Sequence, residues 1–166
     1  MLTRPTHAQG SNKQIPFTRA ADSFGRVTNL VTSYIDASTV YGSDAVRALA
    51  LTNQTNIAFL AVSSVSGSAG PLPPRNSLGS FDVETVYANA DPTKLFLTGG
   101  QRANESPQLL SLHTLFVREH NRRAAAIYAS FSDFETPDIA FSEARRFVIA
   151  TIQRITYYEF LPVLVR

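Results

Sequence analysis

The chain has 166 residues, of which 44% are apolar and 17% charged, so it can form one domain with its own core. Its net charge of +2 is too small to indicate nucleic-acid binding, and no apolar run approaches the roughly 20 residues of a membrane span. The absence of cysteine excludes disulfides, thiolate-bound zinc and cysteine-held iron–sulfur clusters, and no signal peptide is visible at the N-terminus.

The first part of the chain is predicted to contain little regular structure. We expect residues 1–28 to be irregular, because prolines and a glycine interrupt any pattern, with a short extended piece at 15–17. From position 29 onward, apolar residues lie near helical or turn spacing. Ser43 and Asp44 then offer an N-cap for a short helix over 45–51.

The middle of the chain is predicted to be mostly loop. Residues 57–62 form a short apolar run that fits either a buried strand or one helical turn. Residues 63–80 are rich in Ser, Gly and Pro and predict a loop. Since this loop is longer than an ordinary connection, it is either functional or mobile.

Two long helices are predicted to follow. The first runs from about Ser106, as N-cap before a proline, to about Ser130, and the second begins at Thr136 in the same way. A short connection makes them antiparallel neighbours, and Pro162 should end or kink the second. The core-facing stripes are expected to hold Leu109, Leu112, Phe116, His120 and Ile127, and Ile139, Phe141, Val148, Ile152 and Ile155. The fold is therefore mainly α, with long loops and little or no β structure.

Arg102 and Glu105 lie three residues apart at the entrance of the first long helix. Such a pair is usually a surface ion pair, and a carboxylate before a helix usually interacts with the helix dipole. The pair also suits a site where negative charge develops, because a guanidinium offers fixed donors and keeps its proton. The residue types alone leave both interpretations open.

The run RANESPQLLSLHTLFVREHNR, residues 102–122, resembles the animal-type heme peroxidases of the peroxidase–cyclooxygenase superfamily. The resemblance implies a heme b cofactor, with Arg102 as the distal-side arginine that stabilises charge during peroxide cleavage. It implies that Glu105 orients the heme, or forms an ester with it as in several members. Some members form a sulfonium link through a methionine after this glutamate, and Ser106 excludes that link here.

Residues 32–43 form a second signature. Thr32, Tyr34, Asp36 and Ser38 offer a hydroxyl, a backbone carbonyl, a carboxylate and a hydroxyl, the oxygen ligands that calcium prefers. The spacing alone is equally typical of a helix with local Ser and Asp caps. The run also resembles the calcium loop of the same family, which implies that these four residues bind calcium.

The three histidines do not supply the rest of such a site. His113 and His120 lie two helical turns apart, about 10.5 Å along the axis, which is too far for joint ligation of one ion. We expect both to be core residues, and His7 lacks the family's Asp-His pattern. The resemblance implies that the distal histidine precedes this slice and the proximal one follows it, so the isolated chain is expected to be inactive.

The resemblance covers residues from about 15 to 166 and implies one partial peroxidase domain, with residues 29–166 as its helical part. The implied activity is the reduction of hydrogen peroxide with oxidation of small electron donors or halides, in response to oxidative stress. The implied location is secreted or extracellular, and the chain should need the rest of the domain. Two alternatives stay open: a non-catalytic calcium-binding or interaction module, and a fatty-acid dioxygenase relative.

Overall fold

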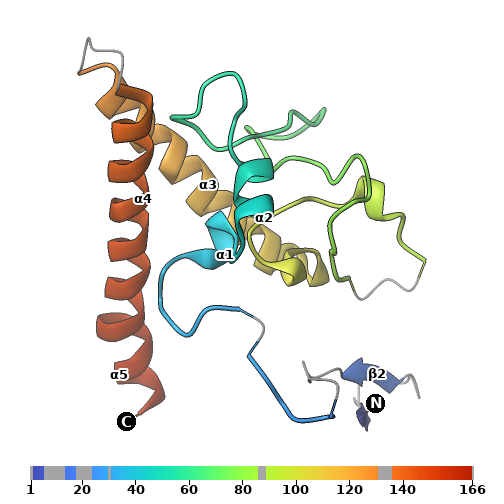
Figure 1. The fold of residues 1–166 in the computed structure, drawn as a ribbon. Helices are drawn as coiled ribbons and strands as arrows, with labels where there is room; N and C mark the ends of the chain where they lie inside the picture. Colours follow the sequence, from blue (N-terminus) through green and yellow to red (C-terminus); the bar gives the residue numbers. More distant parts are fainter. Residues whose placement is uncertain are drawn as a thin grey trace. The chain divides into compact units, whose positions relative to one another are not determined.

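The computed structural model describes residues 2–5, 14–17, 24–29, 31–85, 89–130 and 136–165. The chain separates into two compact units, Met1–Ser33 and Tyr34–Arg166. The second unit contains the helices, which Figure 1 labels. No helix among the described residues is long and apolar enough to cross a membrane.

The first unit contains a two-stranded ladder. Strands β1 (Leu2–Pro5) and β2 (Gln14–Phe17) pair antiparallel, with Leu2 opposite Phe17. The extended piece expected at 15–17 is confirmed as part of β2. The expected irregularity of residues 1–28 is wrong for these two strands, because a ladder of two strands has only edges, where proline is tolerated.

Two short helices open the second unit. Helix α1 (Ser38–Tyr41) follows Ala37, whose φ of 58° turns the backbone into the left-handed region. Helix α2 (Ala45–Leu51) begins as predicted, because the Asp44 carboxylate accepts a hydrogen bond from the Arg47 amide at 2.8 Å. Local capping chemistry is therefore enough to locate this helix.

The two long helices also form where the caps predict them. Helix α3 (Pro107–Tyr128) starts after Ser106, whose hydroxyl accepts from the Leu109 amide at 3.2 Å. Helix α4 (Thr136–Ile155) packs against α3 and runs in the opposite direction (Figure 1). The predicted antiparallel pair is confirmed.

The helical path continues beyond α4. A π-helical turn, η3 (Thr156–Phe160), leads into a short helix, α5 (Leu161–Leu164), that contains Pro162. Pro162 therefore does not end the helical path. Proline has no backbone N–H to donate to the preceding turn, and here it lies in the first turn of α5, where that donor is not needed.

The core-facing stripes differ from the prediction. Leu112 on α3 is 54% exposed, and Ile139 and Ile155 on α4 are 42% and 39% exposed, so their assignment to the core was wrong. On α4, Ala140 and Ala144 are fully buried and let the two helices approach closely. The buried stripe of α3 consists of His113, Thr114, Val117, His120 and Ala124.

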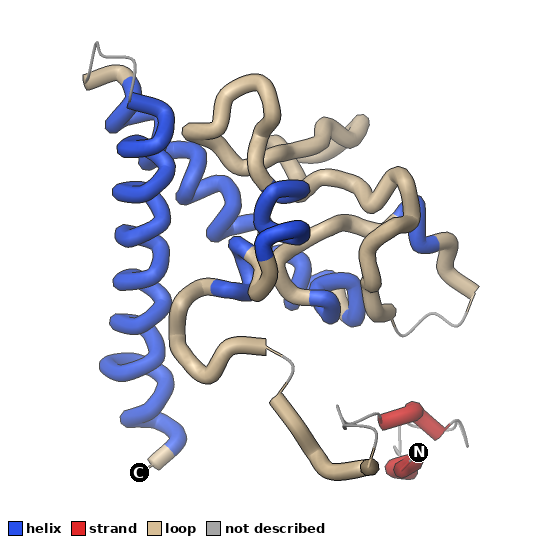
Figure 2. The backbone as a smooth tube through the Cα atoms, in the orientation of Figure 1, coloured by secondary structure: helices blue, strands red, loops and turns tan. Residues whose placement is uncertain are grey.

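The stretch between α2 and α3 is mostly irregular, and residues 63–80 form the predicted loop (Figure 2). Residues 57–62 form neither a regular strand nor a helix. Instead, the Asn121 side chain accepts from the Leu60 amide at 2.8 Å and donates to its carbonyl at 3.0 Å. The run also makes an isolated antiparallel bridge between Leu60 and Thr52, so a side chain of α3 and the end of α2 together satisfy its backbone.

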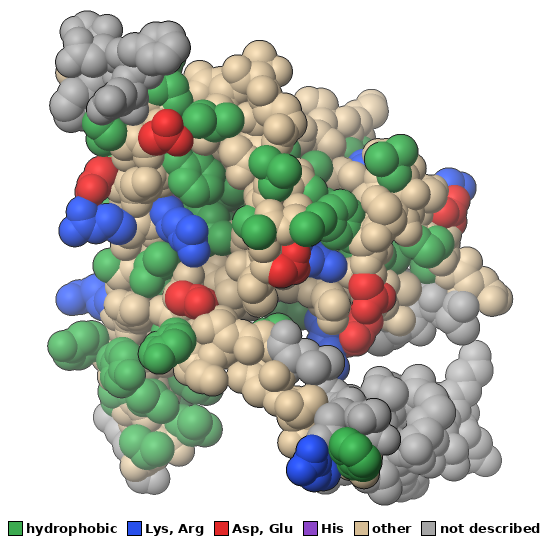
Figure 3. All heavy atoms as spheres, in the orientation of Figure 1, with side chains coloured by type: hydrophobic (Ala, Val, Ile, Leu, Met, Phe, Trp, Pro, Cys, Tyr) green, Lys and Arg blue, Asp and Glu red, His purple; other side chains and the backbone are tan. Residues whose placement is uncertain are grey.

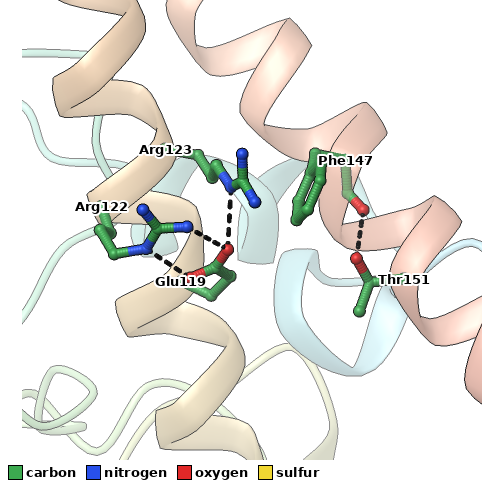
Figure 4. A network of polar contacts seen from close by, with 5 residues as sticks. All are labelled: Glu119, Arg122, Arg123, Phe147 and Thr151. Atoms are coloured by element: carbon green, nitrogen blue, oxygen red, sulfur yellow. Dashed lines mark hydrogen bonds and ion pairs between the residues drawn. The ribbon is translucent and has the colours of Figure 1, made fainter.

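A charged cluster lies where α3 faces α4 (Figure 4). Glu119 accepts hydrogen bonds from Arg122 at 2.8 Å and from Arg123 at 2.9 Å. These bonds lower the pKa of Glu119 to about 2. The Arg123 guanidinium carbon also lies 3.5 Å from the ring centroid of Phe147 on α4, a cation–π contact between the helices.

Both long helices expose large apolar side chains, as expected for a partial domain. Leu112 and Leu115 are more than half exposed on α3. Hydrophobic side chains also gather over the end of the C-terminal helix in Figure 3. The exposed members there are Tyr157, Tyr158, Phe160, Val163, Leu164 and Val165. Such patches typically contact another protein surface.

Candidate functional site

Arg102 and Glu105 belong to a 3₁₀ turn, η2 (Gln101–Glu105), which leads into α3. Ala103 within this turn is completely buried. Asn104 fixes the turn further: its amide group donates to the Phe96 carbonyl at 2.8 Å and accepts from the Phe96 amide at 2.9 Å. The buried Ala103 and the hydrogen-bonded Asn104 therefore hold the backbone from which Arg102 and Glu105 project.

The side chains of Arg102 and Glu105 converge. The Arg102 Nε lies 3.6 Å from a Glu105 carboxylate oxygen, and the two side chains are 55% and 38% exposed. Glu84 makes a shorter contact, accepting a hydrogen bond from the same Nε at 3.0 Å. The bond to Glu84 is the main reason that the pKa of Arg102 lies above its ordinary value. Sequence reasoning missed Glu84, which lies 18 residues upstream in a stretch without a recognisable pattern.

The segment before Arg102 lies directly on helix α1. A Cβ atom on Gly99 would come within 2.2 Å of the Ser38 carbonyl oxygen and 2.5 Å of the Gly42 nitrogen. The Gly100 amide donates to the Thr39 carbonyl at 3.0 Å. Only a residue without a side chain fits such a close approach. Gly99 therefore lets the chain leading into η2, called the arginine turn below, pack against α1, the helix that follows Asp36.

The predicted calcium loop has a local hydrogen-bond pattern. The Asp36 carboxylate accepts from the Ser38 amide at 3.0 Å, a local turn two residues long, whereas the N-cap of α1 is Ala37, which makes no side-chain cap. Gln153 on α4 donates to the Ile35 carbonyl at 2.9 Å and ties the loop to the long helix. Asp36 and Ser38 share the second unit with Tyr34, while Thr32 belongs to the first. Calcium binding by these four residues stays a prediction.

His120 is a structural residue, as predicted. It is completely buried, with one ring nitrogen 2.9 Å from the Tyr41 hydroxyl and the other 3.3 Å from the Ala58 carbonyl. Phe141 packs edge-on at 4.8 Å between ring centroids. Burial lowers the pKa of His120 to about 4, and the nearby charge of Arg145 acts in the same direction. Its ring is therefore neutral near pH 7, with both nitrogens engaged.

His113 is also buried in α3, at 7% exposure. Its Nδ1 lies 2.8 Å from the Leu109 carbonyl, while Nε2 has no hydrogen-bond partner among the described residues. Burial lowers the pKa of His113. The ring lies beside Gly100, next to the arginine turn. The expected core role holds for His113, whereas His7 lies outside the described residues.

The comparisons with known proteins agree with this architecture. The sequence model of the family described as animal haem peroxidase matches residues 3–166. The chain is 38% identical over 157 residues to mouse eosinophil peroxidase and 39% identical over 137 residues to mouse myeloperoxidase. It is also 38% identical over 145 residues to the peroxidasin homolog pxn-2 of Caenorhabditis elegans. The chain belongs to the animal haem peroxidase family.

The solved structure of peroxidase A from Dictyostelium discoideum superposes with a TM-score of 0.75 at 28% identity. The match covers 91% of this chain and 32% of that one. The alignments to eosinophil peroxidase, myeloperoxidase and pxn-2 cover 89%, 81% and 84% of this chain, but only 22%, 19% and 11% of those relatives. The mainly α, partial peroxidase-like fold is thus confirmed.

Arg102 and Glu105, directly before the first turn of α3, have the chemistry of a site at the edge of a heme. The Arg102 guanidinium is anchored through Nε, and its terminal amino groups donate no hydrogen bond to any described residue. Those groups can bind an anionic oxygen. Beside them stands the carboxylate of Glu105, held on a rigid turn and about a third exposed.

Proposed function

We propose that this chain supplies the arginine and glutamate of the heme site in an animal heme peroxidase. The observation that carries the proposal is the convergence of Arg102 and Glu105 on a turn held by the buried Ala103 and the hydrogen-bonded Asn104. Relatives named eosinophil peroxidase and myeloperoxidase support a peroxidase activity in general. The proposed substrates are hydrogen peroxide and a small electron donor or halide, in a response to oxidative stress and in an extracellular setting.

Each residue would have a distinct task. Heme, when bound, supplies the redox-active iron at which peroxide is cleaved. Arg102 would donate hydrogen bonds to the oxygen that gains negative charge, and its high pKa keeps it protonated throughout. Glu105 would orient the heme b ring or tether it through an ester. The loop with Thr32, Tyr34, Asp36 and Ser38 would bind calcium, with α1 linking it to the arginine turn.

The isolated chain should have little or no peroxidase turnover. A residue that moves a proton and a residue that would hold the iron would both be needed, and the buried His113 and His120 are poorly suited to either role. His120 uses both ring nitrogens in structural contacts, and Nδ1 of His113 lies against a backbone carbonyl. Catalysis therefore requires histidines from the rest of the peroxidase domain.

A titration with ferric heme tests this function. We expect a saturable change of the Soret band on binding to the purified chain, followed by no guaiacol oxidation when peroxide is added. Rapid turnover by the 166-residue chain would contradict the proposal that the catalytic histidines come from the rest of the domain. No Soret change at any heme concentration would remove the support for heme binding by Arg102 and Glu105.

A second candidate is a non-catalytic interaction module. The exposed apolar side chains at the end of the C-terminal helix favour it, because such a surface promotes association. Size-exclusion chromatography with light scattering separates the two functions. Self-association without heme uptake supports the module, whereas a monomer that takes up heme supports the peroxidase site.

A further inference from the structure

Glu84 is the nearest acidic partner of Arg102, although it lies outside the run that resembles the peroxidase motif. Its carboxylate oxygen is 3.0 Å from the Arg102 Nε, compared with 3.6 Å for Glu105. The contact to Glu84 meets the geometric criteria of a hydrogen bond. Glu84, rather than Glu105, is therefore the main anchor of the guanidinium.

The backbone around Glu84 is fixed to the same turn as Arg102. The Glu84 amide donates to the Gln101 carbonyl at 2.8 Å. The neighbouring Thr85 hydroxyl donates to the Asn104 carbonyl at 3.2 Å. These bonds reach the turn on both sides of Arg102, so the Glu84 carboxylate is held beside the guanidinium by its own main chain.

We propose that Glu84 is a positioning residue for Arg102 in the heme site, an inference that rests on the proposed function. It holds the guanidinium through Nε and thereby leaves the terminal amino groups to bind an anionic oxygen. Because Glu84 is the primary partner of Arg102, the Glu105 carboxylate remains available to the heme. The three residues thus form an ordered set: an anchor, a cationic group and a heme-facing carboxylate.

The exposure of the pair separates positioning from stability. The side chains of Glu84 and Arg102 are 39% and 55% exposed, and ion pairs this exposed contribute little to folding. The proposed role of Glu84 is therefore to orient Arg102 and not to stabilise the fold. The raised pKa of Arg102, caused mainly by Glu84, agrees with a persistent contact.

Nuclear magnetic resonance of the arginine Nε–H groups tests the anchor without any ligand. We expect Glu84→Ala to speed proton exchange at the Arg102 Nε about fivefold, the upper end of the effect of an exposed ion pair. Glu84→Gln keeps an acceptor and should restore part of the protection, while Glu105→Ala should change it little. Arg122, whose Nε donates to Glu119, serves as an internal control. Unchanged exchange in Glu84→Ala overturns the inference.

Heme affinity then tests whether Glu84 acts through Arg102. Ferric protoporphyrin should bind Glu84→Ala several-fold more weakly than the unchanged chain, with no further loss when Glu84→Ala is added to Arg102→Gln. An equal loss in both backgrounds overturns the positioning role. If no variant binds ferric protoporphyrin while Glu84→Ala still speeds Arg102 exchange, the anchor is supported and the proposed function is overturned instead.

Discussion

Helix α3 and the 3₁₀ turn η2 before it hold two polar regions of opposite character. In its middle, His120 is completely buried, and both ring nitrogens contact polar groups from α1 and the loop after α2. Before its first turn, Arg102 has a 55% exposed side chain held through a single nitrogen. His120, with both ring nitrogens engaged, therefore stabilises the fold, whereas Arg102, anchored through one nitrogen with its other donors unused, suits ligand binding.

Removing His120 should break the buried region most severely. His120→Ala leaves the Tyr41 hydroxyl and the Ala58 carbonyl without their partner and opens a cavity against Phe141. The expected loss in free energy of unfolding is about 3–5 kcal/mol. Urea denaturation followed by circular dichroism measures it. A loss below about 1 kcal/mol, the range of exposed pairs, would show that the region is not a stabilising core.

Acid should weaken the same region. The pKa of His120 is about 4 in the folded chain, below the ordinary 6.5, so between these values only the unfolded chain takes up the proton. The free energy of unfolding should therefore fall by up to about 3 kcal/mol as pH drops from 6.5 to 4. The pKa of His113 is also lowered, so its protonation on unfolding reduces the free energy of unfolding in the same direction. Denaturation at several pH values should give a flatter profile for His120→Gln, and an identical profile would contradict this origin.

The packing of the chain before Arg102 against α1, which carries Tyr41, can be tested at Gly99. Gly99→Ala places a methyl group against the backbone of α1 and should cost about 2 kcal/mol or more of stability. Gly67→Ala is the control, because Gly67 has open space and only the backbone cost of its φ of 80°, about 1 kcal/mol. Thermal unfolding compares the two variants. Equal losses would mean that the close approach to α1 is not needed.

The smallest effect on stability is expected at the arginine itself. Arg102→Gln should change the free energy of unfolding by less than about 1 kcal/mol, because its ion pairs are exposed. Arg146→Gln, which removes another exposed i,i+3 pair on α4, should give a similar value by chemical denaturation. A loss as large as that of His120→Ala would make Arg102 a structural residue.

Local chemistry predicted the helix starts, because a cap acts within a few residues. Asp44 and Ser106 accept the amide hydrogen bonds that open α2 and α3, as expected from their types. The buried faces were less predictable, because tight packing through Ala140 and Ala144 decides which stripe of α4 is covered. Apolar residues such as Leu112 fit the helical period and are nevertheless exposed.

Of the candidate site, only the residues within the short motif that contains Arg102 and Glu105 could be predicted from the sequence. Arg102 and Glu105 are three residues apart, so a turn brings them together wherever the rest of the chain lies. Glu84 and Asn121 act on residues 18 and 61 positions away, and no local pattern marks such contacts. The four predicted calcium ligands follow from a family resemblance alone, and the hydrogen bond that Asp36 accepts from the Ser38 amide is a local turn.

The most direct measurement compares ferric heme affinity in two charge-neutral double variants. One removes the proposed heme pair (Arg102→Gln with Glu105→Gln), and the other removes the exposed α4 pair of the same spacing (Arg146→Gln with Glu143→Gln). We predict that the first binds heme at least about tenfold more weakly than the unchanged chain, the cost of losing charge-assisted hydrogen bonds. The second should bind unchanged. Equal affinity in all three proteins would contradict the account.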